Sequence, residues 1–159
     1  MEQIGFGGSC HWCTEAIFQS LRGVIEVRQG WIASTGEAAG FSEAVLVAFN
    51  PQVISLAILI EVHLRSHSCT SEHSLRAKYR SAIYTFNSQQ ENAAQQIINE
   101  LQSEFDQLII TKVLPFDQFR LNQEKYLNYY YNDPNKPFCQ NIVSPKLNAL
   151  RRRFGDVMR

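Results

Sequence analysis

The chain has 159 residues, of which 45% are hydrophobic and 19% are charged. A chain of this length corresponds to one domain and buries enough surface to fold without disulfides or a structural metal. Its 15 basic and 15 acidic residues cancel to a net charge of zero, which argues against binding to nucleic acid or to an anionic membrane.

Turn residues and hydrophobic periodicity predict strands that alternate with helices. In the first half of the chain we expect a strand at 3–6, a helix from His11, strands at 24–31 and 43–49, and a helix that Ser55 caps and that ends at about 66. A strand at 79–86 follows, and then a helix that begins with a Ser88–Glu91 capping box and keeps helical spacing through Phe105. The chain should end with a strand at 108–114, a helix at 117–131 and an irregular tail from about 132.

Residues 43–49 are apolar at both parities, which is typical of a central strand covered on both faces. The alternation as a whole predicts an α+β, two-layer α/β fold with helices packed on one mixed sheet. We expect a single domain over residues 1–159.

Four cysteines, Cys10, Cys13, Cys69 and Cys139, are too few for a disulfide framework in a chain of this length. The N-terminal residues lack the pattern of a signal peptide, and no apolar run reaches the ~20 residues of a membrane span. We therefore expect a cytoplasmic protein whose cysteines serve chemistry. Any one of them can also be a small buried apolar residue.

Cys10 follows a predicted strand and a glycine turn, and it lies at the start of a predicted helix. Free N–H groups and the helix dipole favour the thiolate there, so Cys10 is a candidate nucleophile. Cys13 lies one helical turn further on, close enough for a Cys-x-x-Cys disulfide. Trp12 beside them either lines an apolar pocket for a methyl or thioether group or packs in the core.

Glu43 shares its strand parity with Val45 and Val47, which places a carboxyl group on an apolar face of the sheet. Burial there favours the neutral acid, which can donate a proton. The alternative is a solvated position at the mouth of the strand. Tyr79, at the start of its predicted strand, offers a phenolic donor or simply packs.

A segment around Cys10 and a series of later motifs carry a family resemblance. Ser9-Cys10-His11-Trp12 is similar to a Gly-Cys-Phe-Trp segment. Further matches are Glu15-Ala16-x-Phe18, Leu21, Gly23-Val24, Gly30-Trp31, Glu43-Ala44-Val45, Phe49-Asn50-Pro51, Tyr79-Arg80-Ser81-Ala82-Ile83, Tyr126-Leu127, Phe138-Cys139, Pro145-Lys146-Leu147 and Leu150-Arg151. In this order, from Gly7 to Phe154, the chain resembles the class A peptide methionine sulfoxide reductases (MsrA).

The resemblance implies a ferredoxin-like fold of the MsrA type and thiol-dependent reduction of the S epimer of methionine sulfoxide, free or in peptides. Cys10 would attack the sulfoxide sulfur, and Glu43 would protonate the departing oxygen. Tyr79 would help to hold that oxygen, and Trp12 would pack against the methyl group. The family needs no bound cofactor, and we expect a monomeric catalytic domain.

The resemblance also implies that the Cys10 sulfenic acid condenses with a second thiol to form a disulfide. Thioredoxin or another dithiol would then reduce that disulfide. Cys139 matches the family's C-terminal resolving cysteine, whereas Cys13 is a rival because of its spacing from Cys10.

The chain departs from the family pattern near the expected site. His11 replaces an aromatic residue of the substrate pocket with a group that titrates near neutrality and can stabilise the Cys10 thiolate. The loop between Trp31 and Glu43 is about ten residues shorter than usual and lacks the family's tyrosine. Polar family residues elsewhere correspond to Ser74, Arg120 and Gln123.

Three other functions are compatible with parts of the sequence. A zinc site is one, with ligands drawn from Cys10, Cys13, His63, His67, Cys69 and His73. A thioredoxin-like disulfide oxidoreductase built on the Cys10–Cys13 pair is the second. The third is a catalytically weak or silent binding module of the same fold.

Overall fold

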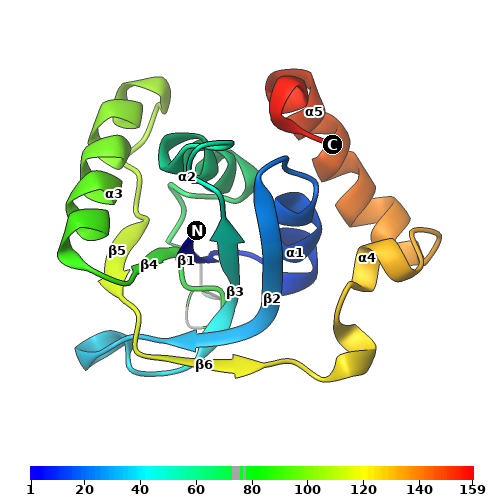
Figure 1. The fold of residues 1–159 in the computed structure, drawn as a ribbon, viewed down its shortest axis with the longest axis horizontal. Helices are drawn as coiled ribbons and strands as arrows, with labels where there is room; N and C mark the ends of the chain where they lie inside the picture. Colours follow the sequence, from blue (N-terminus) through cyan, green and yellow to red (C-terminus); the bar gives the residue numbers. More distant parts are fainter. Residues whose placement is uncertain (73–75, 77) are drawn as a thin grey trace.

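The computed structural model describes residues 1–72, 76 and 78–159. In this part of the chain one sheet has the strand order β5-β4-β1-β3-β2-β6 (Figure 1). The strands are β1 (Glu2–Gly7), β2 (Val24–Ala33), β3 (Ser42–Phe49), β4 (Ala82–Thr85), β5 (Lys112–Pro115) and β6 (Gln118–Leu121). Neighbouring strands are antiparallel except β4 and β5, which are parallel. The sheet is therefore mixed, as predicted.

Helices cover one face of this sheet. The longer ones are α1 (His11–Gln19), α2 (Leu56–Ser66), α3 (Ser88–Leu101) and α5 (Ser144–Phe154), and α4 (Tyr129–Asn132) is a single turn. Their apolar side chains meet those of the strands in one core that reaches from Ile4 to Met158. This arrangement confirms the predicted α+β class.

The central position predicted for residues 43–49 is confirmed, because β3 lies between β1 and β2 and all eight of its residues are buried. Val45 and Val47 face the helices, whereas Leu46 joins a second, smaller cluster on the opposite face with Ile32 and Tyr84. The side chain of Ser55 caps α2, as expected, by accepting the N–H of Ile58 at 3.2 Å.

Several predicted boundaries are wrong. Asn87, rather than Ser88, caps α3, because its extended backbone lets its side chain accept the N–H of Gln90 at 2.7 Å. Helix α3 ends at Leu101 instead of reaching Phe105. The strand expected at 79–86 is shorter than predicted, since β4 spans Ala82–Thr85. The strand expected at 108–114 corresponds to β5, which begins only at Lys112, where its pairing with β4 starts.

The helix predicted for 117–131 is also wrong, because its first part is strand β6 at the edge of the sheet. Gly30 on β2 permits this pairing. A Cβ atom at Gly30 would lie 1.9 Å from the carbonyl oxygen of Arg120, so only glycine allows β6 to approach. Local helical propensity has here yielded to tertiary hydrogen bonding.

The irregular tail expected from about 132 is instead largely helical. A π-helical turn at Cys139–Val143 leads directly into α5. Helix α5 starts with Pro145 in its first turn and buries Leu147, Leu150 and Phe154 along one face. Burial of this stripe against the core explains why the segment is ordered.

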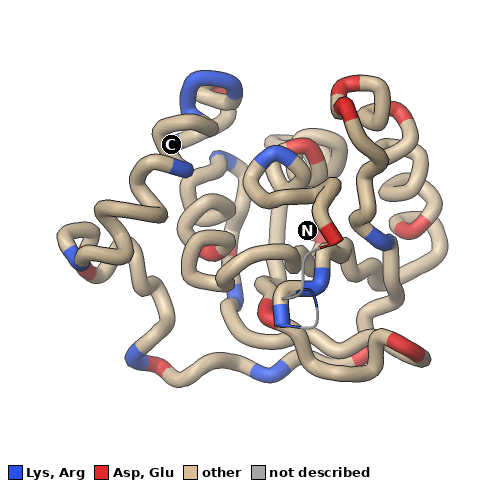
Figure 2. The backbone as a smooth tube through the Cα atoms, turned by 180° about the vertical axis from the view of Figure 1, so that it is seen from behind, with Lys and Arg blue, Asp and Glu red and all other residues tan. Residues whose placement is uncertain are grey.

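Charged residues of both signs are spread over the whole fold, as Figure 2 shows, and the basic run at 151–153 lies at the end of α5. None of the helices in the described ranges is both long and apolar enough to cross a membrane.

Candidate functional site

Cys10 lies at the N-cap of α1, directly after β1 and a glycine turn, and its side chain is partly exposed. Its carbonyl oxygen accepts the N–H groups of Cys13 and Thr14 at 3.1 and 3.2 Å. The turn requires Gly8, which has a φ of 149° and whose Cβ would collide with the ring of His67. The chain therefore presents the Cys10 sulfur at a helix N-terminus, as predicted.

The electrostatics of Cys10 favour a thiolate. A hydrogen bond from the Cys13 thiol has the largest effect and lowers the Cys10 pKa. Burial raises this pKa, the backbone N–H of Trp12 lowers it, and the negative charge of Glu43 raises it. The net pKa of Cys10 lies below its usual value. The pKa of Cys13 is raised, because its thiol donates this hydrogen bond and because it is buried. Of the two thiols, Cys10 is therefore the one that ionises more readily, and Cys13 is the one that stays protonated.

Glu43 lies at the start of β3, and its side chain is only 8% exposed. One carboxylate oxygen, Oε1, accepts the backbone N–H of His11 at 3.3 Å. The other oxygen, Oε2, lies 3.5 Å from the Nζ atom of Lys78. The structure therefore brings Glu43 to the N-terminus of α1, beside Cys10.

The His11 side chain is buried between α1 and β2 rather than exposed in the cavity. Its Nδ1 atom lies 2.9 Å from the carbonyl oxygen of Gly30, and its Nε2 atom lies 3.5 Å from Oε1 of Glu43. The Nδ2 group of Asn122 is 3.3 Å from the same Nε2 atom. His11 therefore contacts the candidate acid, whereas we expected it to contact substrate.

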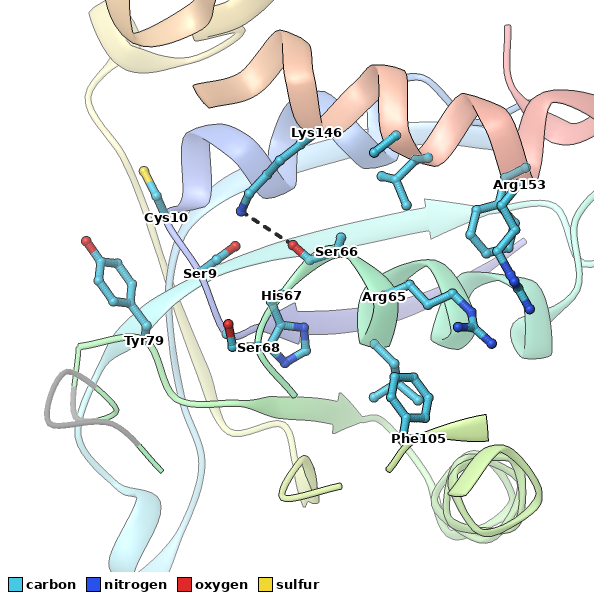
Figure 3. A pocket seen from close by; sticks show the side chains of 15 residues that line it. Ser9, Cys10, Arg65, Ser66, His67, Ser68, Tyr79, Phe105, Lys146 and Arg153 are labelled. Carbon is cyan, nitrogen blue, oxygen red and sulfur yellow. Dashed lines mark hydrogen bonds between the residues drawn. The ribbon is translucent and has the colours of Figure 1, made fainter. Parts of the chain in front are cut away.

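A cavity of about 710 Å³ opens at Cys10. Figure 3 shows Cys10 and Tyr79 side by side at one end, and Arg65, Phe105 and Arg153 at the other. Between these two ends the Nζ atom of Lys146 donates to the carbonyl oxygen of Ser66 at 3.4 Å. Tyr79 lies in the loop before β4, and its ring is 5.1 Å from the Nζ atom of Lys78.

Trp12 lies under an aromatic cluster formed by the segment after β6. Its ring stacks on Tyr129 at 4.1 Å between centroids and on Tyr126 at 5.6 Å, and its contact with Phe138 is edge-to-face at 5.5 Å. One side of the indole is therefore already occupied, which leaves only part of Trp12 for contact with a ligand.

Cys139 is fully buried at the start of the π-helical turn, next to Phe138. Burial raises its pKa. A charge on Cys139 would also raise the pKa of Cys13, so the two sulfurs lie within electrostatic range. All four cysteines, Cys10, Cys13, Cys69 and Cys139, are free thiols in this structure.

Among the residues that the structure describes, the candidate zinc ligands do not come together. Over the described ranges, no three His, Cys, Asp or Glu residues are grouped so that they could hold a metal ion. The Nε2 atom of His63 donates to the Gly7 carbonyl at 2.7 Å, and His67 contacts the hydroxyl of Ser81 at 2.7 Å. Cys69 is buried in the core. His73 and Ser74 lie outside the described residues.

Sequence reasoning missed Lys78 and the polar pair Gln29 and Asn122. Lys78 directly precedes Tyr79, and that adjacency was the available signal. Asn122 follows β6, which we expected to be helical, so its contact with His11 could not be inferred. Arg120 of β6 places its guanidinium group over the ring of Phe41 at 4.4 Å.

Comparisons with known proteins agree with this geometry. A family model described as "Peptide methionine sulfoxide reductase" matches residues 2–157. The peptide methionine sulfoxide reductase MsrA of Deinococcus radiodurans is 36% identical over 174 residues, which cover 99% of this chain and 84% of the relative.

Solved structures share the fold. The reduced form of Mxr1 from Saccharomyces cerevisiae superposes with a TM-score of 0.76 at 21% identity and covers 87% of this chain and 88% of that one. Mxr1 in complex with Trx2 superposes with a TM-score of 0.63 at 23% identity and covers 78% and 82% of the two chains. With the family match over nearly the whole chain, the protein belongs to the peptide methionine sulfoxide reductases and is an enzyme that reduces methionine sulfoxide.

Proposed function

We propose that Cys10 is the nucleophile and Glu43 the general acid in the reduction of the S epimer of methionine sulfoxide. The observation that carries this assignment is the partly exposed Cys10 sulfur at the N-terminus of α1, with its pKa lowered by the Cys13 thiol and with Glu43 held by the adjacent His11 N–H. A thiolate nucleophile beside a buried carboxyl group meets both chemical needs of the reaction.

In the first step the Cys10 thiolate attacks the sulfoxide sulfur, and Glu43 delivers a proton to the oxygen. The sulfur–oxygen bond of the substrate breaks, the oxygen ends on Cys10 as a sulfenic acid, and methionine leaves. Two electrons pass from the cysteine sulfur to the substrate sulfur. Tyr79, at the same end of the cavity, donates a hydrogen bond to the oxygen, and the uncovered part of Trp12 packs against the methyl group.

The sulfenic acid is resolved by a second thiol. In our proposal Cys13 reacts first, because its thiol acts on the Cys10 sulfur strongly enough to be the main cause of the lowered Cys10 pKa. Condensation forms the Cys10–Cys13 disulfide and releases water. Cys139, within electrostatic range of Cys13, then exchanges with this disulfide. An external dithiol such as thioredoxin reduces the final disulfide, a proposal supported by the related yeast structure with Trx2.

The cavity favours a peptide-bound substrate. Its volume of about 710 Å³ exceeds what one methionine side chain fills, and it extends from Cys10 along α2 and α5. Residues that flank the oxidised methionine would occupy the part near Lys146. We further propose that the enzyme acts as a cytoplasmic monomer, in one catalytic domain, without a bound cofactor.

The test is reduction of separated S and R epimers of a methionine sulfoxide peptide, with dithiothreitol as reductant. We expect turnover of the S epimer that disappears in Cys10→Ser and falls by about 10²–10⁴-fold in Glu43→Gln. Cys69→Ala is the matched control, because Cys69 is a buried cysteine away from the site. Full activity of Cys10→Ser would refute the assignment of the nucleophile, and full activity of Glu43→Gln would refute the assignment of the acid.

The order of resolution is tested by peptide mapping after one turnover without reductant. When the wild-type reaction is quenched early, the protein should contain a Cys10–Cys13 disulfide. Cys13→Ala should instead accumulate the Cys10 sulfenic acid, which a dimedone probe labels. A Cys10–Cys139 disulfide formed at the wild-type rate in Cys13→Ala would show that Cys139 resolves directly.

A further inference from the structure

Arg76 binds four backbone carbonyl groups from separate parts of the chain. It lies between α2 and β4, three residues before Tyr79. Its Nε atom donates to the carbonyl oxygen of Ser71 at 2.8 Å, and its Nη2 atom donates to that of Ser68 at 2.5 Å. Its Nη1 atom donates to the carbonyl oxygens of Gly8 and Tyr79, each at 2.8 Å. One side chain therefore joins the turn after β1, the segment after α2 and the loop before β4.

The two hydrogen bonds of Nη1 connect the two segments that meet at the site. Gly8 lies two residues before Cys10, the proposed nucleophile, and Tyr79 carries the phenol that lies beside Cys10 in the cavity (Figure 3). Nη1 carries two hydrogens, so each carbonyl group has its own N–H donor. The spacing between the turn before Cys10 and the backbone of Tyr79 is thus set by one nitrogen atom.

The guanidinium group continues the strand pairing at this point. In the described part of the chain, pairing between β1 and β4 ends at Gly7 and Ala82. Beyond this pair the chain turns through Gly8, whose φ is 149°, toward α1. Arg76 bridges Gly8 and Tyr79 just beyond the last pair, where a further hydrogen bond of the ladder would otherwise hold the two chains together.

The residues on both sides of Tyr79 are held by β3. The backbone N–H of Glu43 donates to the carbonyl oxygen of Lys78 at 3.0 Å, and the Ser42 hydroxyl donates to the same oxygen at 2.9 Å. The backbone N–H of Arg80 donates to the Ser42 hydroxyl at 2.8 Å. This part of the backbone is therefore tied to the strand that carries the proposed acid, and the guanidinium group adds the tie to the turn of the proposed nucleophile.

Arg76 acts from behind the site. Its side chain lines a second cavity, of about 440 Å³, together with Arg80 and Ser81, whereas Tyr79 lines the cavity at Cys10. A guanidinium group offers five N–H donors in one rigid plane, whereas a lysine ammonium offers three donors on a single atom. Lysine therefore cannot reproduce this set of hydrogen bonds.

We propose that Arg76 is a positioning residue for sulfoxide reduction, which places the Tyr79 phenol at the oxygen of the substrate bound at Cys10. The inference rests on the proposed role of Tyr79 as a hydrogen-bond donor to that oxygen. As the sulfur–oxygen bond breaks, the oxygen carries negative charge until Glu43 protonates it. A phenol that is already aligned stabilises this charge, and a displacement of about 1 Å can slow such a step by about 10²-fold.

The test measures single-turnover reduction of the S epimer of a methionine sulfoxide peptide. We expect Arg76→Gln to slow the reaction by about 10–10²-fold at saturating peptide. The half-saturating peptide concentration should stay within about twofold of wild type, because the phenol acts on the transition state. Arg76→Lys keeps the charge and should also be slowed. Arg152→Gln, which changes an exposed arginine of α5, is the matched control and should react like wild type. A wild-type rate in Arg76→Gln or in Arg76→Lys would overturn the proposal.

A double-mutant cycle with Tyr79→Phe shows through which group Arg76 acts. Tyr79→Phe alone should be slowed. In that background Arg76→Gln should slow the reaction by less than about twofold further, because the hydroxyl group that Arg76 positions is gone. An undiminished effect of Arg76→Gln in the Tyr79→Phe background would mean that Arg76 acts on another part of the protein, and the proposal would be wrong.

NMR of ¹³C-labelled tyrosine rings gives a readout that is independent of turnover. The Tyr79 signal is assigned by its absence in Tyr79→Phe, and Tyr84, which is fully buried in β4, reports whether the fold is intact. We expect Arg76→Gln to move or broaden the Tyr79 signal and to leave the Tyr84 signal in place. An unchanged Tyr79 signal would contradict the proposal. A Tyr84 signal disturbed in both Arg76→Gln and Arg76→Lys would assign Arg76 a general structural role and would likewise refute it.

Failure of this inference can be told apart from failure of the proposed function. If Cys10→Ser is inactive and Tyr79→Phe is slow while Arg76→Gln reacts like wild type, the inference fails and the proposed function stands. If Tyr79→Phe reacts like wild type, the role of Tyr79 and the inference fail together, and the roles of Cys10 and Glu43 are unaffected.

Discussion

Glu15 ties α1 to the segment that carries the aromatic cover of Trp12, and its removal should destabilise the fold. The side chain is 1% exposed, and its two oxygens accept the N–H groups of Asn128 at 2.9 Å and of Tyr129 at 3.2 Å. Asn128 adopts a left-handed conformation with a φ of 54°. Glu15→Ala would leave both N–H groups without an acceptor and release the turn before α4.

The magnitude follows from the two hydrogen bonds. Each bond to a charged acceptor contributes about 1.5–3 kcal/mol, and burial of the carboxylate, which raises the Glu15 pKa, offsets part of the sum. We expect Glu15→Ala to lower the free energy of unfolding by about 2–4 kcal/mol. For a chain of this length the corresponding fall in Tm is about 4–16 °C.

Urea denaturation of wild type, Glu15→Ala and Glu15→Gln at pH 7 measures this effect. Glu15→Gln keeps one acceptor oxygen and should lose less than Glu15→Ala. Since the folded-state pKa is raised, the stabilising contribution of Glu15 is fully present below its unfolded pKa and decreases as pH rises through the folded pKa. The difference in free energy of unfolding between wild type and Glu15→Gln should therefore change in favour of wild type as pH falls toward 4. A Glu15→Ala protein within about 0.5 kcal/mol of wild type would refute the reasoning.

Burial lowers the pKa of His63 to about 4. The contribution of neutral His63 to stability is therefore present above pH 6.5 and is lost as pH falls toward 4, by up to about 3 kcal/mol. Urea denaturation at a series of pH values should show this loss in wild type and not in His63→Asn. Cys13→Ala removes the hydrogen bond that lowers the Cys10 pKa, so a smaller fraction of Cys10 should be thiolate at pH 7. Iodoacetamide should therefore alkylate Cys10 more slowly in this variant. An unchanged alkylation rate would contradict this account. Gly30→Ala would place a Cβ atom 1.9 Å from the carbonyl oxygen of Arg120, so we expect β6 to detach from β2. The free energy of unfolding should fall by about 2 kcal/mol or more, and amide hydrogen exchange at 118–121 should become faster. Unchanged exchange at 118–121 would disprove the steric argument.

Local signals in the sequence were sufficient for the elements that carry Cys10, the proposed nucleophile. The Gly7-Gly8 turn, the helix after Cys10 and the buried run of β3 all follow from short-range rules of turn chemistry and hydrophobic pattern. Ser55 at the start of α2 is a further example, since a cap involves only residues within one turn. These interactions are close in sequence, and so the sequence alone predicts them.

The second half of the chain illustrates the limit of such rules. Residues 118–121 form strand β6 because β2 offers a free edge at Gly30, a partner almost ninety residues earlier in the chain. Likewise, α5 is ordered by the core against which Leu147 and Phe154 pack. Neither partner can be read from the neighbouring sequence, because an edge and a core exist only once the rest of the chain has folded.

The sequence by itself identified candidate residues for the chemistry, among them Cys10, Cys13 and Glu43, because residue type and local position influence reactivity. Only the tertiary structure decided which side chains surround them. It buries His11 against Glu43 instead of in the cavity, covers Trp12 with Tyr129, and brings Cys139 near Cys13. Each of these contacts joins segments that are distant in the chain, and a periodic pattern contains no information about which distant segments meet.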